Sequence, residues 1–390
     1  MRVLILVVLC PILWAQSFEA IVENALKSNE RIKNLNLEIE QLENQRKIAY
    51  KWDNPTITSG YNTLYLSNPT YRNDAMQSIS VGISQKLDLF AKKPIEAEKF
   101  SLQKQIKLLE LKALKKDIIK QIKIQMIKNH QDQNKIRVLN ETLKNLSLLK
   151  QQINIGTSNF PLDEIYKLEI SETKIKLSLQ EMLERQRSQI IKLNEITFGN
   201  EKGIDFENKI QKNFSEEYYK QSFALKIQTL KEKFDLENIH LAQRSFLSDP
   251  TLSVNYFYRQ KHPDFISFAI SFSLPLYGRE ILSLKNAKDQ SKITKSQTLS
   301  LENKIKAQIK SLSNTISHKK KELSLIDQHL IAQLQKLITL YQKNISNQAQ
   351  AMSAYHQAIN DLLQAQLLRI EVYGAILLSY AELESLGETK

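Results

Sequence analysis

The stretch FISFAISFSLPLYG, residues 265–278, alternates large apolar side chains with small ones. In an extended strand, alternate side chains point to opposite faces. The apolar face carries Ile266, Phe268, Ile270, Phe272 and Leu274. The opposite face carries Ser267, Ala269, Ser271 and Ser273. The pattern predicts a β-strand with one face in an apolar environment and the other in a polar one.

Three further segments predict similar strands: TITSGYNTLYL (56–66), SISVGIS (78–84) and TLSVNYFY (251–258). A soluble sandwich would bury the apolar faces against a second sheet. A membrane barrel would instead place them in lipid, with the small polar faces on a water-filled lumen and tyrosines as interfacial girdles. The lumen candidates are Ser78, Ser80, Ser84, Thr251, Ser253, Asn255, Ser267, Ser271 and Ser273. The girdle candidates are Tyr61, Tyr65, Tyr256, Tyr258 and Tyr277.

The strands lie between long segments that contain neither glycine nor proline, residues 95–155 and 279–373. Their apolar residues recur at spacings of three and four, which predicts long amphipathic helices. A helix of about 60 residues would be about 90 Å long. That length excludes a compact domain and leaves a periplasmic coiled-coil scaffold as one alternative, although such a scaffold would not explain the strands.

The chain also contains a tandem repeat. Phe90 recurs as Tyr277, Gly156 as Asn344 and Gly199 as Gly387, at an offset of 187 or 188 residues. The first repeat, 16–199, is predicted to hold a helix over about 18–51, a hairpin over about 56–87, a long helix, a tip at 156–159 and a return helix from Pro161. The second, 216–390, repeats this order with a helix over about 216–248, a hairpin over about 251–274 and a tip at 344–347, after a linker at 200–215.

The N-terminal sequence MRVLILVVLCPILWAQS predicts a signal peptide over residues 1–15. Cys10, the single cysteine, follows Leu9 instead of a small residue, which does not favour cleavage as a lipoprotein. No downstream segment is read as an apolar helix of about 20 residues, so any membrane span is predicted to consist of strands.

Composition argues against several other functions. The net charge of +13 is spread along the whole chain and is not interleaved with aromatic residues, so nucleic-acid binding is not expected. The six histidines form no His-x-x-x-His pair, and no phosphate loop or nucleophile elbow is present. We therefore expect no enzyme activity, catalytic residue, metal site or cofactor. His356 is interpreted as a helix-surface residue and His262 as part of a turn.

Four strands cannot close a membrane barrel, and open sheet edges are not tolerated in lipid. If the strands form a membrane barrel, the chain must therefore oligomerise. Two copies would supply 8 strands and three would supply 12, and only the larger number leaves a useful channel.

The duplicated order of helix, Asn-Pro or Asp-Pro, hairpin, LDLF or LPLYG element, long helix, tip and return helix resembles the TolC-like outer membrane efflux proteins. The resemblance covers the whole chain after residue 15. It implies an α+β membrane protein: a homotrimer with a 12-stranded β-barrel in outer membrane lipid and a long α-helical barrel of coiled coils in the periplasm. It also implies an exit duct that conducts substrates from a proton-driven inner-membrane pump through a periplasmic adaptor.

The resemblance implies two sets of site residues. The adaptor-contacting tips are Gly156, Thr157, Ser158 and Asn159, and Asn344, Ile345, Ser346 and Asn347. Gln350 and Ser353 occupy the periplasmic entrance, where some members carry an acidic ring. The second tip departs from the family pattern, because Asn344 stands where glycine is usual.

The segment from Asn344 to Gly387 is similar to the branch that serves heavy-metal efflux pumps. That branch has I-L-P-Q-A followed by A-Y-x-x-G-x-x-D-L-L and A-E-L-E-x-x-x-G. Ser346, Asn347 and Ala358 replace the Leu, Pro and first Gly of these motifs. The cargo implied is a heavy-metal ion, and multidrug efflux or type I protein secretion are alternatives that use the same kind of duct.

Overall fold

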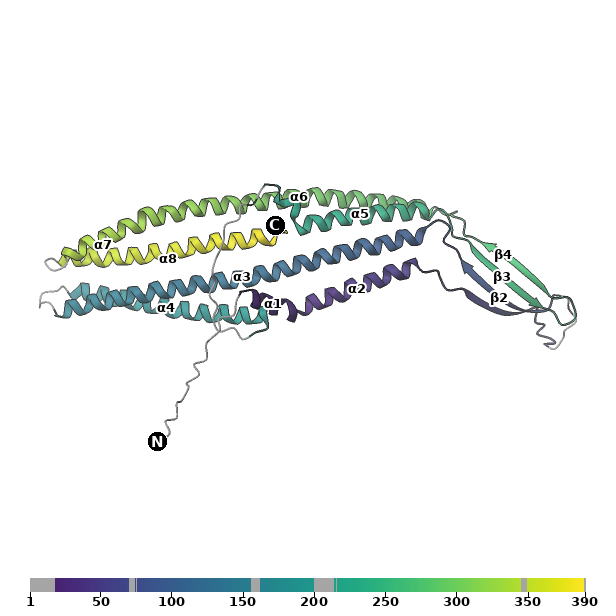
Figure 1. Cartoon of the computed structure of the whole chain (residues 1–390), viewed down its shortest axis with the longest axis horizontal. Helices are drawn as coiled ribbons and strands as arrows, with labels where there is room; N and C mark the ends of the chain where they lie inside the picture. The colour runs from purple at the N-terminus through teal and green to yellow at the C-terminus, as the bar shows by residue number, and fades with distance from the viewer. Residues whose placement is uncertain are drawn as a thin grey trace, which may run out of the picture. The chain divides into compact units, whose positions relative to one another are not determined.

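The computed structural model describes residues 18–69, 74, 76–155, 162–199, 214, 216–344 and 349–388. The predicted signal peptide and most of the linker and tips lie outside these residues. The elements are α1 (Phe18–Ser28), α2 (Glu30–Tyr50), β1 (Thr56–Asn62), β2 (Ser78–Lys86), α3 (Lys92–Ile155), α4 (Leu162–Thr197), η1 (Glu216–Gln221), α5 (Phe223–Arg244), β3 (Thr251–Tyr258), β4 (Phe265–Ser271), α6 (Arg279–Leu325), η2 (Ile326–Ile331), α7 (Ala332–Asn344) and α8 (Ala349–Ser385) (Figure 1).

The chain divides into two compact units, and each contains segments of both sequence repeats. Unit 1 comprises residues 1–33, 112–223 and 303–390, and unit 2 comprises residues 34–111 and 224–302. The long helices α3 and α6 contribute residues to both units. They begin at Lys92 and Arg279, which are equivalent positions in the repeats.

Unit 1 is helical, and its main core lies between α3, α4 and α8. Leu139 and Leu146 of α3 pack with Leu168 of α4 and with Met352 and Ile359 of α8. Helix α7 lies beside α8 (Figure 1) and adds partly buried side chains to this core. These contacts follow the predicted three-and-four spacing, which places one apolar stripe of each helix on its neighbours.

Helix α8 differs from the sequence prediction in one respect. Among the described residues, Met352–Ser385 is one helix long and apolar enough to cross a membrane by length and composition, so the statement that no such segment exists is wrong. Its composition has another explanation in the structure. Met352, Leu363, Ile376 and Leu383 are buried among the helices of unit 1, and a helix surrounded on several sides needs apolar residues on several sides.

Unit 2 contains one antiparallel sheet of four strands in the order β1-β2-β3-β4. Strand β1 pairs with β2 to form the first hairpin, and β3 pairs with β4 to form the second. Pairing of β2 with β3 joins the two hairpins. The strands extend beyond the ends of α2 and α5 (Figure 1). In this unit, no described helix lies over either face of the sheet.

Several element ends differ from those predicted. The first helix is divided at Asn29, whose side-chain Oδ1 accepts a hydrogen bond from the Ile32 N–H at 3.3 Å, as an N-cap does. The second-repeat helix begins as a 3-10 turn and ends at Arg244 instead of near residue 248. Strand β1 ends at Asn62 because Thr63 has a positive φ of 58°. Strand β4 ends at Ser271, before Pro275, which has no N–H for a ladder.

The residues that precede α3 and α6 share a left-handed conformation. Ala91 has φ 51° and Gly278 has φ 70°, and they are equivalent positions in the repeats. Glycine adopts this conformation freely, whereas alanine does so at a cost of about 1–2 kcal/mol. Helix α3 therefore follows a strained residue, Ala91, whereas α6 follows an unstrained one, Gly278.

We expect Ala91→Gly to stabilise the protein and Gly278→Ala to destabilise it. Relief of strain at Ala91 is offset by the greater freedom of glycine in the unfolded chain, which leaves a net gain of about 0.5 kcal/mol. A Cβ at Gly278 would meet no atom of the described residues within 4 Å, so its effect isolates the backbone conformation. Thermal unfolding of both variants checks this pair, and a shift of the same sign in both would contradict it.

Candidate functional site

The strand register sorts the side chains of the sheet into two faces. Residues opposite one another in an antiparallel pair lie on the same face. The central row of one face is Ile57, Ile83, Val254 and Phe268. The central row of the other face is Thr58, Gly82, Asn255 and Ser267. We call these the apolar face and the small face, and they continue across all four strands.

The apolar face is exposed within the chain. Phe268 is 78% exposed and Ile57 is 74% exposed, and Ile83 and Val254 between them are also exposed. In β3 the residues of the apolar face are uniformly more exposed than those of the small face. A soluble sandwich requires the opposite arrangement, with the apolar face covered.

Eight of the nine predicted lumen residues lie on the small face. Ser78, Ser80 and Ser84 are in β2, Thr251, Ser253 and Asn255 are in β3, and Ser267 and Ser271 are in β4. At the centre of the face, the Asn255 side chain lies over Gly82. A Cβ built on Gly82 would lie 1.9 Å from Asn255 Oδ1, so glycine provides the space that the amide occupies.

Ser273 is the exception among the predicted lumen residues. It follows the end of β4 and has no partner in the sheet ladder. Its backbone N–H donates to Ser248 Oγ at 3.0 Å, which ties the chain after β4 to the segment before β3. The alternation of large and small residues in the sequence continues beyond Ser271, where strand pairing ends. Ser273 was predicted to face the lumen from this alternation alone, but it lies outside the paired part of the sheet.

The tyrosines gather near the two ends of the sheet. Tyr61 and Tyr258 flank Ile79 in the last row of the apolar face, beside the hairpin loops, and Tyr256 lies in the next row. Tyr277 lies at the other end, before α6, and is 96% exposed. Interfacial girdles of a membrane barrel lie at both ends of its strands, and the girdle assignment of these tyrosines stays a prediction.

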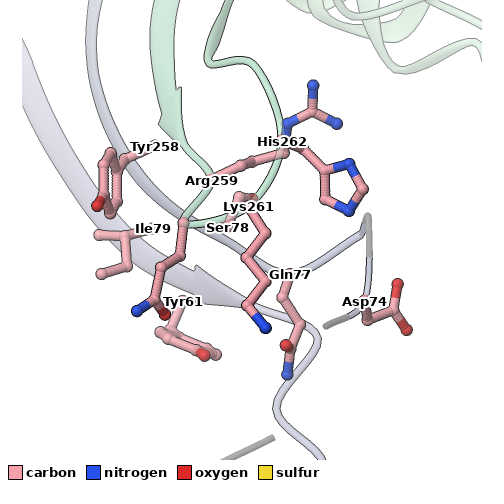
Figure 2. A pocket seen from close by; sticks show the side chains of 10 residues that line it. Tyr61, Asp74, Gln77, Ser78, Ile79, Tyr258, Arg259, Lys261 and His262 are labelled. Atoms are coloured by element: carbon pink, nitrogen blue, oxygen red, sulfur yellow. The ribbon is translucent and has the colours of Figure 1, made fainter. Parts of the chain in front are cut away.

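A small cavity of about 50 Å³ lies at the loop end of the sheet (Figure 2). Its lining includes Asp74 and Gln77 from the first hairpin and Arg259 and His262 from the second. Asp74 accepts hydrogen bonds from the Tyr65 hydroxyl and from the Met76 N–H, and these lower the pKa of its carboxyl. His262 lies in the turn between β3 and β4, as predicted.

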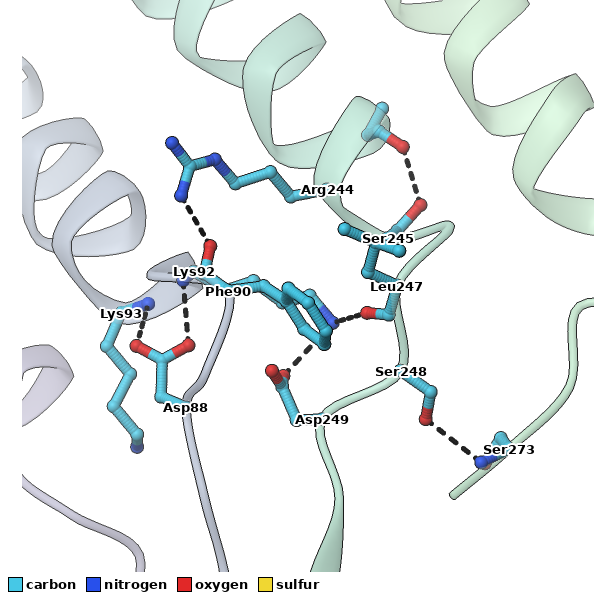
Figure 3. A network of polar contacts seen from close by, with 11 residues as sticks. Asp88, Phe90, Lys92, Lys93, Arg244, Ser245, Leu247, Ser248, Asp249 and Ser273 are labelled. Atoms are coloured by element: carbon cyan, nitrogen blue, oxygen red, sulfur yellow. Dashed lines mark hydrogen bonds and ion pairs between the residues drawn. The ribbon is translucent and has the colours of Figure 1, made fainter.

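Polar contacts join the hairpins at the other end of the sheet, where the helices begin (Figure 3). Asp88 caps α3 by accepting hydrogen bonds from the backbone N–H groups of Lys92 and Lys93 at 2.8 and 3.0 Å. Lys92 Nζ pairs with Asp249 Oδ2 at 3.0 Å and also donates to the Leu247 carbonyl. Arg244 donates to the Phe90 carbonyl. The contacts of Lys92 with Leu247 and of Arg244 with Phe90 could not be predicted from local sequence patterns, because their partners are 155 and 154 residues apart.

Most of the predicted tip residues lie outside the described residues. Gly156 to Asn159 and Ile345 to Asn347 belong to this group, whereas Asn344 is the last residue of α7. Gln350 and Ser353 lie in the first turns of α8. The tip and entrance assignments therefore remain predictions.

His356 is buried, so its interpretation as a helix-surface residue is wrong. The residue is 8% exposed, and its Nε2 lies 3.1 Å from Asn360 Nδ2. Burial lowers the pKa of the imidazole below its usual 6.5, and Lys167 adds to this effect while the Glu164 carboxylate opposes it. The periodicity of α8 could not reveal this burial, because the helix is packed on more than one side.

We expect His356 to make the stability of the helical part fall at acidic pH. The unfolded chain binds a proton at this imidazole below about pH 6.5, whereas the folded chain resists it, so stability is full above that pH and declines below it. His356→Gln should flatten this decline. Thermal unfolding of both proteins from pH 7.5 to 5.5 measures the difference, and parallel curves would contradict the prediction.

The sequence matches no protein-family model and no curated relative. The structure is similar to VceC, an outer membrane protein of Vibrio cholerae, with a TM-score of 0.78 over 95% of this chain and 96% of VceC at 13% identity. It is similar to CusC, with a TM-score of 0.76 over 95% of this chain and 92% of CusC at 14% identity. The chain has the TolC-like outer membrane channel fold.

A third solved structure with this TolC-like fold is the CmeC outer membrane channel of Campylobacter jejuni. Its TM-score is 0.73 over 95% of this chain and 85% of CmeC, at 12% identity. Each of these three matches spans 95% of the chain. The predicted fold class, long helices with four strands per chain, is confirmed by this comparison.

Proposed function

We propose that this chain is the outer membrane exit duct of a tripartite efflux system. One observation carries the proposal: the four-stranded sheet exposes its apolar face and directs its small polar face away from it. The apolar face would contact lipid, and the small polar face would contact water in the lumen. The duct conducts substrates passively by keeping a polar solute in water as it crosses the membrane.

The open edges of the sheet support a homotrimer. Strands β1 and β4 are edge strands of the sheet in the single chain. Unpaired backbone groups at an edge are costly in lipid, so β4 of one copy would pair with β1 of the next. Three copies close a barrel of 12 strands, which leaves a lumen wide enough for solutes.

The partners follow from the same proposal. The tips at residues 156–159 and 344–347 would contact a periplasmic adaptor, and an inner-membrane pump would deliver the substrate. Heavy-metal ions are the cargo we propose to test first, because the segment from Asn344 to Gly387 is similar to the heavy-metal branch. Increased metal sensitivity in a strain that lacks this gene would support that cargo, whereas increased drug sensitivity alone would favour multidrug efflux.

Cell fractionation and native mass test the duct itself. The full chain, expressed with its N-terminal segment in a Gram-negative host and extracted in mild detergent, should appear in the outer membrane as a trimer. A soluble monomer or dimer in the periplasm would overturn the proposal and favour the scaffold reading.

A further inference from the structure

The small face of the sheet carries one aromatic pair that interrupts its row of small residues. The row nearest the loop between β3 and β4 consists of Gly60, Ser80, Phe257 and Phe265. The neighbouring row towards the helices is Thr58, Gly82, Asn255 and Ser267. Among the described strand residues of this face, Phe257 and Phe265 are the aromatic ones. Apart from Lys86 at the helix end of β2, the other strand residues of this face are Ser, Thr, Gly, Asn and Ala, so the face becomes bulky at the level of the aromatic pair.

The two rings form a defined structure. Phe257 and Phe265 are direct cross-strand partners, and their rings stack with centroids 4.6 Å apart and planes within 7° of each other. The guanidinium of Arg259 lies over the Phe265 ring, 5.0 Å from its centroid. Stacked aromatic pairs and a covering cation each add to stability, so the rings are held in place.

The loop next to the pair is also fixed by hydrogen bonds. Arg259 Nε donates to the Pro263 carbonyl at 2.8 Å, and the Arg259 N–H donates to Asp264 Oδ1 at 2.7 Å. The Tyr256 hydroxyl donates to the other Asp264 oxygen, and these bonds lower the pKa of the Asp264 carboxyl, which stays ionised at neutral pH. The aromatic pair thus rests on an ordered hairpin end.

We infer that Phe257 and Phe265, buttressed by Arg259, form the narrowest level of the barrel lumen at its outer mouth and limit the size of the solutes that leave it. The inference rests on the proposed function, since it requires the small face to line a lumen. In a closed trimer, three such pairs lie at one level of the pore. Phenylalanine rings reach farther into a lumen than the serine and glycine side chains of the same row, and lining residues set the effective radius of a pore.

Cysteine labelling from outside the cell tests this level separately from the rest of the duct. A cysteine at Ser253 lies on the small face two rows beyond the aromatic pair, and a cysteine at Gln260 lies in the loop outside it. Intact cells are treated with maleimides attached to polyethylene glycol of increasing size. Cells whose protein carries neither introduced cysteine give the level of nonspecific labelling. The rate of labelling at Ser253→Cys is compared between the protein with the native aromatic pair and the Phe257→Ser/Phe265→Ser variant.

We expect the small maleimide to label both cysteines in the native background and the large reagents to label only Gln260→Cys. In Phe257→Ser/Phe265→Ser, the large reagents should label Ser253→Cys at least several-fold faster. Phe257→Leu/Phe265→Leu keeps apolar side chains on the hairpin and should give an intermediate rate, which keeps the test valid if the serine variant folds poorly. The amount of trimer in the membrane is measured for each variant.

The unfavourable outcomes differ for the two proposals. If Ser253→Cys is labelled with the same size limit in every background, the aromatic pair does not set the exit size, while the duct proposal stands. If Ser253→Cys is not labelled by the small maleimide in any of the three backgrounds although Gln260→Cys is, the small face does not line a lumen. The duct proposal and the inference then both fall.

Discussion

Phe268→Arg is expected to abolish assembly of the protein in the outer membrane. Phe268 lies in the central row of the apolar face and is 78% exposed in the single chain. An arginine at the bilayer midplane of a membrane barrel costs about 2–4 kcal/mol, and a trimer incurs this cost three times. The loss is comparable with the whole stability of a typical folded domain. We therefore expect little or no trimer in the outer membrane fraction.

The neighbouring residue provides the matched control. Ser267→Arg introduces the same side chain one position away, on the small face opposite Asn255. A water-filled lumen solvates the guanidinium, so this variant should reach the membrane in nearly normal amounts. Native gels of outer membrane extracts compare the two. If the small face were instead packed against protein, the results would be reversed, with Phe268→Arg tolerated in water and Ser267→Arg damaging.

The two faces of the sheet could be predicted from the sequence because the information is local. The alternation in residues 265–271 sets the faces of one strand, and no distant residue is needed to recognise it. The long helices were predictable for a similar reason, since an uninterrupted run without glycine or proline favours helix at every position.

The ends of elements and the buried polar residues were not predictable, because they depend on tertiary contacts. Thr63 and Ala91 adopt positive φ although neither residue type prefers it. His356 is buried by helices far away in the sequence. Phe257 alternates in sequence with Thr251, Ser253 and Asn255 of the small face. This alternation could have added an aromatic residue to the predicted lumen residues.

Lys92→Met is expected to destabilise the junction between sheet and helices by about 3 kcal/mol. The Lys92 side chain is 19% exposed and its partner Asp249 is 8% exposed. Among the described residues, Asp249 Oδ1 is buried and accepts no hydrogen bond, and Lys92 is the cation that compensates this carboxylate. Methionine preserves the apolar stem of the side chain but leaves the charge unpaired, which is the costly way to disrupt a buried ion pair.

The adjacent lysine separates this effect from a general loss of charge. Lys93 Nζ pairs with Asp53 at 3.0 Å, but the Asp53 side chain is 53% exposed, and such pairs contribute about 0–1 kcal/mol. Lys93→Met should therefore change stability little. Asp249→Asn in the Lys92→Met background removes the unpaired charge, so the double variant should recover most of the loss.

Tryptophan fluorescence provides the measurement, because the sequence holds two tryptophans and Trp14 lies within the predicted signal peptide. Trp52 is then the single reporter in the mature chain, and it lies between Lys51 and Asp53, both of which contact Lys93. Guanidinium unfolding in detergent should give a lower midpoint for Lys92→Met than for Lys93→Met. Equal midpoints would mean that water compensates Asp249, and the ion pair would then not hold the hairpins together.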